Sequence, residues 1–105
     1  MRYQQSQHVF GREALVNSGV LDTAIGDHAL TSCTDCSNNA AIGYQALFSG
    51  VVDQGNTAIG SEALYSNNGA GENTATGWQA LYSTTIGTAN AGFGSKALYN
   101  NTTGN

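Results

Sequence analysis

Two cysteines and two histidines carry the most specific chemistry of this 105-residue sequence. Cys33 and Cys36 form the motif C-T-D-C. A structural zinc site needs four ligands, and the chain offers these two thiols and a distant His28. A redox C-x-x-C opens a helix in a thioredoxin-like setting, which is absent here. We expect a small disulfide that pins a surface loop, with two free thiols or a metal site shared between protomers as alternatives.

The other titratable residues form no recognisable catalytic constellation. His8 and His28 have no partner Ser or Cys at a useful spacing, and we expect both to be solvated. The carboxylates are scattered along the chain: Glu13, Asp22, Asp27, Asp35, Asp53, Glu62 and Glu72. A glycosidase needs two carboxyls about 5–10 Å apart in a groove. Asp27 and Asp35 lie within one repeat, but nothing favours such a pair. We expect no enzyme activity, no resident metal and no cofactor.

These residues are set in a tandem repeat of about 17 residues. Each repeat has an anchor glycine, and the six anchors are Gly11, Gly26, Gly43, Gly60, Gly77 and Gly94. Their spacing is 15 residues and then 17 four times. Ala and Leu always stand three and four residues after the anchor, as in Ala63-Leu64. A fixed period of this kind indicates stacked coils, because one unit cannot bury its own apolar face.

Each repeat predicts a short strand followed by a turn. The N-T-A-I-G stretch has the β-branched residues and terminal glycine of a strand. Five in-register parallel strands are expected at 22–26, 39–43, 56–60, 73–77 and 90–94. The A-L segment contains strong helix formers and predicts one or two helical turns, or a second bent strand. We expect the leucines of this segment to be buried, the Asn column to form a ladder and the Phe48 column to form an aromatic stack.

The predicted fold is therefore a mainly-β solenoid of six coils. Residues 1–8 are a lead-in, and residues 9–105 are one repeat domain. Its coils are placed at 9–22, 23–39, 40–56, 57–73, 74–90 and 91–105. Ala58 and Ile59 are adjacent and apolar, although neighbours in a strand face opposite sides. The small Ala column would admit a second backbone, which favours self-association as a homotrimer over a monomeric solenoid.

Charge and hydropathy limit the possible partners. The net charge is −4, with three cations at Arg2, Arg12 and Lys96. Nucleic acid requires clustered Lys and Arg, so we expect no nucleic-acid partner. No apolar run approaches the ~18–20 residues of a membrane span, so no membrane insertion is expected. The first ten residues lack an apolar signal-peptide core, and the chain ends inside its sixth repeat. We interpret it as a segment of a longer protein.

Strings such as N-T-A-I-G-S-E-A-L-Y-S-N at 56–67 resemble a repeat family of bacteriophage tail fibres and bacterial surface fibres. They are more loosely similar to the heads of trimeric autotransporter adhesins. The likeness covers the chain from Val9 onward. It implies a non-catalytic segment of an extracellular, cell-surface or virion fibre that supports attachment to a host receptor. Because such repeats share architecture more than ligand, the receptor is not implied.

The variable columns indicate where a receptor would bind. Tyr44 and Trp78 directly follow an anchor glycine, and Gln45 and Gln79 come next. Exposed aromatic residues on a rigid scaffold are typical contacts for sugars and proteins. We expect a cell-surface glycan or protein to bind these four residues together with loops 31–38 and 49–55. The alternatives are a pure spacer, or an ice-binding solenoid that uses the column of Thr23, Thr57 and Thr74.

Overall fold

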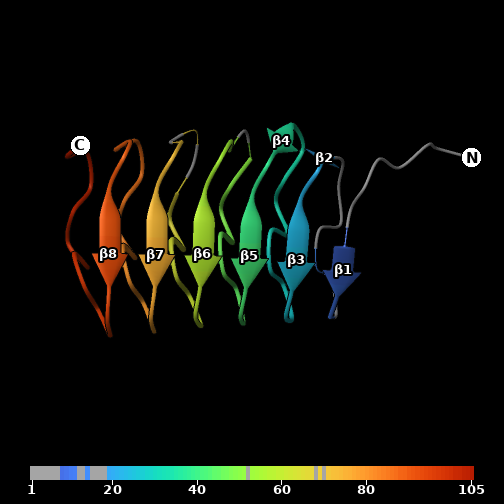
Figure 1. Cartoon of the computed structure of the whole chain (residues 1–105), viewed down its shortest axis with the longest axis horizontal. Helices are drawn as coiled ribbons and strands as arrows, with labels where there is room; N and C mark the ends of the chain where they lie inside the picture. Colours follow the sequence, from blue (N-terminus) through green and yellow to red (C-terminus); the bar gives the residue numbers. More distant parts are fainter. Residues whose placement is uncertain (1–7, 12–13, 15–18, 52, 68, 70) are drawn as a thin grey trace, which may run out of the picture.

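The computed structural model describes residues 8–11, 14, 19–51, 53–67, 69 and 71–105. The strands within these ranges are β1 (His8–Phe10), β2 (Gly19–Val20), β3 (Thr23–Ile25), β4 (Cys36–Ser37), β5 (Ala40–Ile42), β6 (Thr57–Ile59), β7 (Thr74–Thr76) and β8 (Ala91–Phe93). Six of them form one parallel sheet in the order β1-β3-β5-β6-β7-β8, and β2 pairs with β4 (Figure 1). The described ranges contain no helix, and therefore none that could cross a membrane. The chain is a mainly-β parallel solenoid.

The register of the large sheet follows the repeat. Ala41 pairs with Ala58, and Ala58 pairs with Ala75. The five predicted strands are confirmed, each limited to its three central residues. The shorter first spacing is kept in register as well, because Val9 pairs with Ala24. Each strand therefore lies beside its own equivalent from the next repeat.

The interior is built from the invariant Ala and Leu columns. The predicted burial of the leucines is confirmed, since Leu30, Leu47, Leu64 and Leu81 have no exposed surface. The central strand residues Ala24, Ala41, Ala58 and Ala75 are equally buried. At the equivalent Gly92, a Cβ atom would already lie 3.2 Å from the Cγ of Leu81. Space opposite the leucines therefore admits alanine and little more.

This packing corrects the expected role of the Ala column. We expected these small residues to face a second chain, but they line the solenoid's own interior. The outward side chains of the strands are instead the Ile and Phe residues before the anchor. Ile25 and Ile59 are 37% and 39% exposed. The narrow cross-section decides between the two faces, because only the smaller side chain fits inside.

The A-L segment is not helical. It forms a tight turn in which alternate residues adopt left-handed backbone conformations, such as Glu62 (φ 61°) and Leu64 (φ 53°). This geometry directs backbone N–H groups along the solenoid axis. Glu62 donates to the carbonyl of Tyr44, and Leu64 donates to the carbonyl of Ala80. A helix would keep these hydrogen bonds within the segment, so bonding between coils overrides the intrinsic helix propensity.

The anchor column requires glycine for two reasons. Gly43 has a φ of 132°, which disfavours any residue with a side chain. A Cβ atom at Gly43 would also lie 2.6 Å from the carbonyl carbon of Gly60 in the next coil. Larger residues at this corner would push neighbouring coils apart.

Leu64→Ala should lower the free energy of unfolding by about 2–5 kcal/mol, because it opens a cavity in a fully buried column. Leu98→Ala is the matched control, since Leu98 belongs to the same column but is 50% exposed. It should cost about 1 kcal/mol or less, as only part of its surface is removed from water. Urea unfolding measures both values. Equal losses would contradict the stacked-coil core.

Candidate functional site

Tyr44 and Trp78 lie on one edge of the solenoid. Each follows the anchor glycine at the carboxyl end of its strand, and the rings are 51% and 48% exposed. Ser61 holds the equivalent position in the coil between them. Since neighbouring parallel strands are about 4.8 Å apart, the two positions are separated by roughly 10 Å along the axis. The edge presents two aromatic side chains with a small residue between them.

The two glutamines of the expected site differ in their surroundings. Both have left-handed backbones, and their N–H groups donate to the preceding coil, Gln45 to Asp27 and Gln79 to Ser61. The Gln79 Nε2 also donates to the Glu62 Oε1 at 2.8 Å. Gln79 is thus tied to its neighbouring coil through both its backbone and its side chain.

Lys96 joins this edge, although sequence reasoning gave it no role. Its Nζ lies 5.0 Å from the centroid of the Trp78 ring and 5.7 Å from that of Tyr99. The Lys96 N–H also donates to the Trp78 carbonyl. At this corner, hydrogen bonds therefore link residues 18 positions apart, and this offset could have identified the pair. An exposed cation–π contact contributes about 0.5–1 kcal/mol and holds the ammonium group beside the indole.

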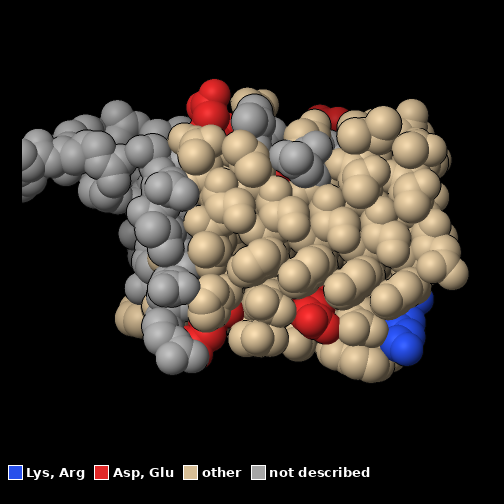
Figure 2. Space-filling view, turned by 180° about the vertical axis from the view of Figure 1, so that it is seen from behind, with Lys and Arg blue, Asp and Glu red and all other residues tan. Residues whose placement is uncertain are grey.

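An aromatic stack runs parallel to this edge. Phe48, Tyr65, Tyr82 and Tyr99 follow one another with ring centroids 5.0–5.1 Å apart and interplanar angles of 4–11°. The predicted stack is confirmed. His28 continues it at one end, since its ring lies 6.3 Å from that of Phe48. Figure 2 shows the back of the molecule, where charged side chains lie at the margins and neutral residues cover the middle.

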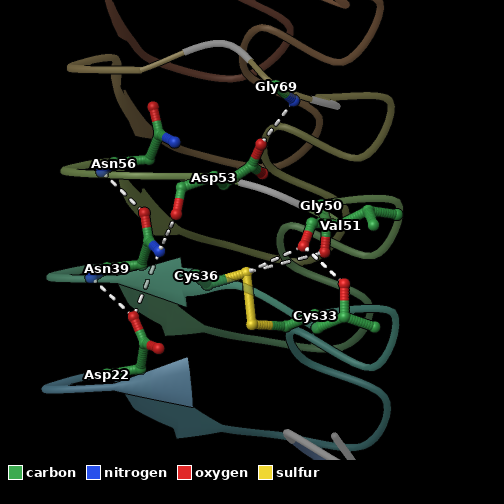
Figure 3. The surroundings of a disulfide bond; sticks show 10 residues. Asp22, Cys33, Cys36, Asn39, Gly50, Val51, Asp53, Asn56 and Gly69 are labelled. Carbon is green, nitrogen blue, oxygen red and sulfur yellow. Dashed lines mark hydrogen bonds between the residues drawn. A yellow bond between two sulfur atoms is a disulfide. The ribbon is translucent and has the colours of Figure 1, made fainter. Parts of the chain in front are cut away.

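Cys33 and Cys36 are joined by a disulfide inside the solenoid (Figure 3). Their exposures are 0% and 2%, so the expected position on a surface loop is wrong. The Cys36 Sγ lies 3.6 Å from the carbonyl oxygen of Val51 and 3.8 Å from that of Gly50. A disulfide sulfur carries no proton, so these are packing contacts. The disulfide fills the space that the next coil fills differently.

That next coil has Gly50 and Asp53 at the equivalent positions. A Cβ atom on Gly50 would overlap the Asp53 carboxylate, so the glycine leaves room for the acid. The Asp53 Oδ1 accepts the Gly69 N–H at 2.7 Å, while Oδ2 is buried without a hydrogen-bond partner (Figure 3). Burial raises the pKa of Asp53 from 3.8 to about 6, against the lowering effect of hydrogen bonds from Gly69 and Asn67.

The loops expected to bind a receptor are therefore divided between two environments. In 31–38 and 49–55, the residues Cys33, Cys36, Gly50 and Asp53 belong to the interior. The exposed residues of these loops are Thr34, Asp35, Asn38, Gln54 and Gly55. Variation along a column thus marked interior substitutions as well as the outer surface.

The remaining candidates for chemistry stay apart. No cluster of three or more His, Cys, Asp or Glu residues able to hold a metal occurs within the described ranges. Asp27 is half-buried and Asp35 is exposed, while the side chain of His8 lies outside the described residues. No known protein family, curated protein or solved structure matches the chain.

Asp53 predicts a loss of stability as the pH rises. Between pH 4 and 6 the folded state retains a proton that the unfolded state releases, so the free energy of unfolding falls with increasing pH. The shift from 3.8 to about 6 corresponds to about 3 kcal/mol at ~1.4 kcal/mol per pKa unit. Asp53→Asn should remove most of this decline. A smaller slope should remain, because burial also raises the pKa of Asp22.

Urea titrations at pH 4, 5, 6 and 7 measure this dependence. Asp35→Asn is the control, because it removes an exposed carboxylate from the same repeat family of loops and should keep the decline. A wild-type stability that is level or rising between pH 4 and 7 would contradict the assignment.

Proposed function

We propose that this chain is a non-catalytic structural and adhesive segment of an extracellular or virion fibre. In this role it supports attachment to a cell-surface receptor. The main support is the separation between an invariant interior and exposed aromatic residues, Tyr44 and Trp78, on one edge. Such a scaffold allows outer residues to change without disturbing the stack. The resemblance of the repeats to tail-fibre and surface-fibre sequences favours the same role.

Self-association as a homotrimer is part of this proposal. The outer face of the large sheet carries apolar side chains, with Phe10 and Phe93 at its ends 67% exposed and Ile59 near its centre 39% exposed. A sheet of apolar outward residues is stabilised when another copy removes it from water. Three-fold closure places three such sheets around one axis, as a fibre requires.

The homotrimer predicts a solution mass near three times the 10.8 kDa of one chain, measured by light scattering. Ile59→Glu should shift the mass toward that of the monomer, because a carboxylate would be buried at the interface. Ser95→Glu is the control, since Ser95 is exposed outside the strands, and it should leave the mass unchanged. A monomeric wild type at micromolar concentration would refute the homotrimer.

Attachment tests the adhesive role. Tyr44→Ala and Trp78→Ala should each weaken binding to an array of immobilised cell-surface glycans and proteins by about tenfold, as expected for loss of an exposed aromatic contact. Melting temperature and oligomer mass should stay nearly constant. Ser61→Ala, which changes the residue between the two rings, is the matched control and should bind like the wild type.

Two outcomes would revise this assignment. If both aromatic variants lose the oligomer, the rings belong to the interface between copies. If both bind as the wild type does, the segment is a spacer that carries a receptor-binding site located elsewhere.

An ice-binding solenoid is the second candidate, favoured by one observation. Thr23, Thr57 and Thr74 stand on the outward face of the parallel sheet, in register with one another. Ala40 and Ala91 interrupt this column. Thermal hysteresis distinguishes the two functions: the fibre proposal expects none, and a clear freezing-point depression that Thr57→Val or Thr57→Lys removes would favour ice binding.

A further inference from the structure

A polar groove of about 420 Å³ lies on the edge of the solenoid opposite Tyr44 and Trp78. Its lining residues are Asn38, Gln54, Gly55, Gly71, Glu72 and Thr88. They precede strands β5, β6, β7 and β8, whereas the two aromatic residues follow strands (Figure 1). In a parallel sheet the amino-terminal ends share one edge, so the groove and the aromatic edge are separate surfaces.

The backbone beneath the groove is already hydrogen-bonded. Gly55 donates to the carbonyl of Ser37 at 3.0 Å, and Glu72 donates to that of Gln54 at 3.1 Å. Gln54 also forms parallel bridges with Ser37 and Gly71. The floor is therefore a fixed part of the ladder between coils. A ligand would meet side chains and glycine surface there, not unpaired backbone.

The side chains around this floor are available for binding. Asn38, Gln54 and Glu72 are exposed, and their side chains make no hydrogen bond with another described residue. The Thr88 hydroxyl lies 3.2 Å from the Asn105 Oδ1 at one end of the groove. Two amides, a carboxylate and a hydroxyl thus surround the groove, with both donors and acceptors among them.

Glycine keeps the centre of the groove open. A Cβ atom at Gly71 would lie 2.9 Å from the Gln54 carbonyl oxygen, so no side chain fits there without displacing the ladder. Gly55 stands in the same column as Asn38 and Glu72, where a side chain is accepted. The glycine therefore separates these two polar groups by an unfilled position.

We propose that this groove binds a neutral oligosaccharide that lies along the solenoid axis. The proposal rests on the adhesive role above and assigns the receptor to a chemical class. Sugar hydroxyls match the amide and carboxylate side chains, and the volume is within the ~300–1,000 Å³ usual for ligand sites. The lining residues come from four successive coils, which span roughly 14 Å at ~4.8 Å per coil. Glu72 is the only charged residue of the lining, and it disfavours anionic sugars.

An NMR titration of the ¹⁵N-labelled chain with defined tetrasaccharides tests the groove. Cellotetraose, maltotetraose and chitotetraose are the neutral probes, and tetragalacturonate is the anionic probe. At least one neutral probe should shift the amide signals of Gln54, Gly55, Gly71 and Glu72 in a saturable manner. Tetragalacturonate should leave them unchanged. The proposal is overturned if no neutral probe gives saturable shifts, or if the anionic probe binds the groove more tightly.

Two variants connect the binding to particular side chains. Gln54→Ala and Glu72→Ala should each weaken the neutral probe by about tenfold, because each removes hydrogen-bonding groups from the lining. Gln45→Ala, on the opposite edge, is the matched control and should bind like the wild type. Circular dichroism and the melting temperature check that each variant remains folded. Unchanged affinity in both groove variants would overturn the proposal.

The same variants separate this proposal from the adhesive role. If Trp78→Ala loses array binding while no tetrasaccharide enters the groove, the adhesive role stands and the groove proposal fails. If a neutral tetrasaccharide binds the groove while the aromatic variants bind the array as before, the receptor site is the groove and the aromatic assignment fails.

Discussion

One side-chain hydrogen bond per coil holds the stack in register. The N–H of each Asn before a strand donates to the side-chain oxygen of its equivalent 17 residues earlier: Asn39 to Asp22, Asn56 to Asn39, Asn73 to Asn56 and Asn90 to Asn73, at 2.8–2.9 Å. These residues are buried along most of the column (Figure 3). Loss of an acceptor would leave a buried donor unsatisfied, at a cost of about 1–3 kcal/mol. A slipped register would break the whole column together.

The Asn side chains also link the two sides of each coil. The Nδ2 of Asn39 donates to the carbonyl of Asp53, and that of Asn73 donates to the carbonyl of Gly87. The amide thus joins neighbouring coils through its oxygen and spans the interior through its nitrogen. With both directions fixed inside, the outer edges are free to differ in sequence. The aromatic edge and the polar groove are two such surfaces on one frame.

The interior itself tolerates more variety than the invariant columns suggest. Cys33 and Cys36 occupy a pair of facing positions as a disulfide, whereas Gly50 and Asp53 occupy the next pair as a glycine and a buried acid. Filling the same space by different chemistry keeps the cross-section constant. The buried acid lowers stability at neutral pH, which the rest of the stack offsets.

Periodicity alone predicted the strands, their parallel register and the burial of Leu64, because a strict 17-residue spacing leaves one way to align equivalent residues. Local propensity failed at Glu62 and Leu64, where bonding between coils imposes left-handed turns on helix formers. Residue size did not reveal that Ala58 faces inward, because that depends on the opposing leucine. The groove was missed for a different reason. Asn38, Gln54 and Glu72 look like ordinary loop residues until stacking brings them together.

The hydrogen bonds of the Asn column can be observed directly. Scalar couplings across hydrogen bonds, measured by NMR, should connect the backbone ¹⁵N of Asn56, Asn73 and Asn90 to the side-chain ¹³Cγ of the Asn 17 residues earlier. Each of these couplings reports one N–H donated to one identified Oδ1. Their detection would establish both the register and the interaction that maintains it. Protected amides at these positions that couple instead to backbone carbonyl carbons would contradict the account.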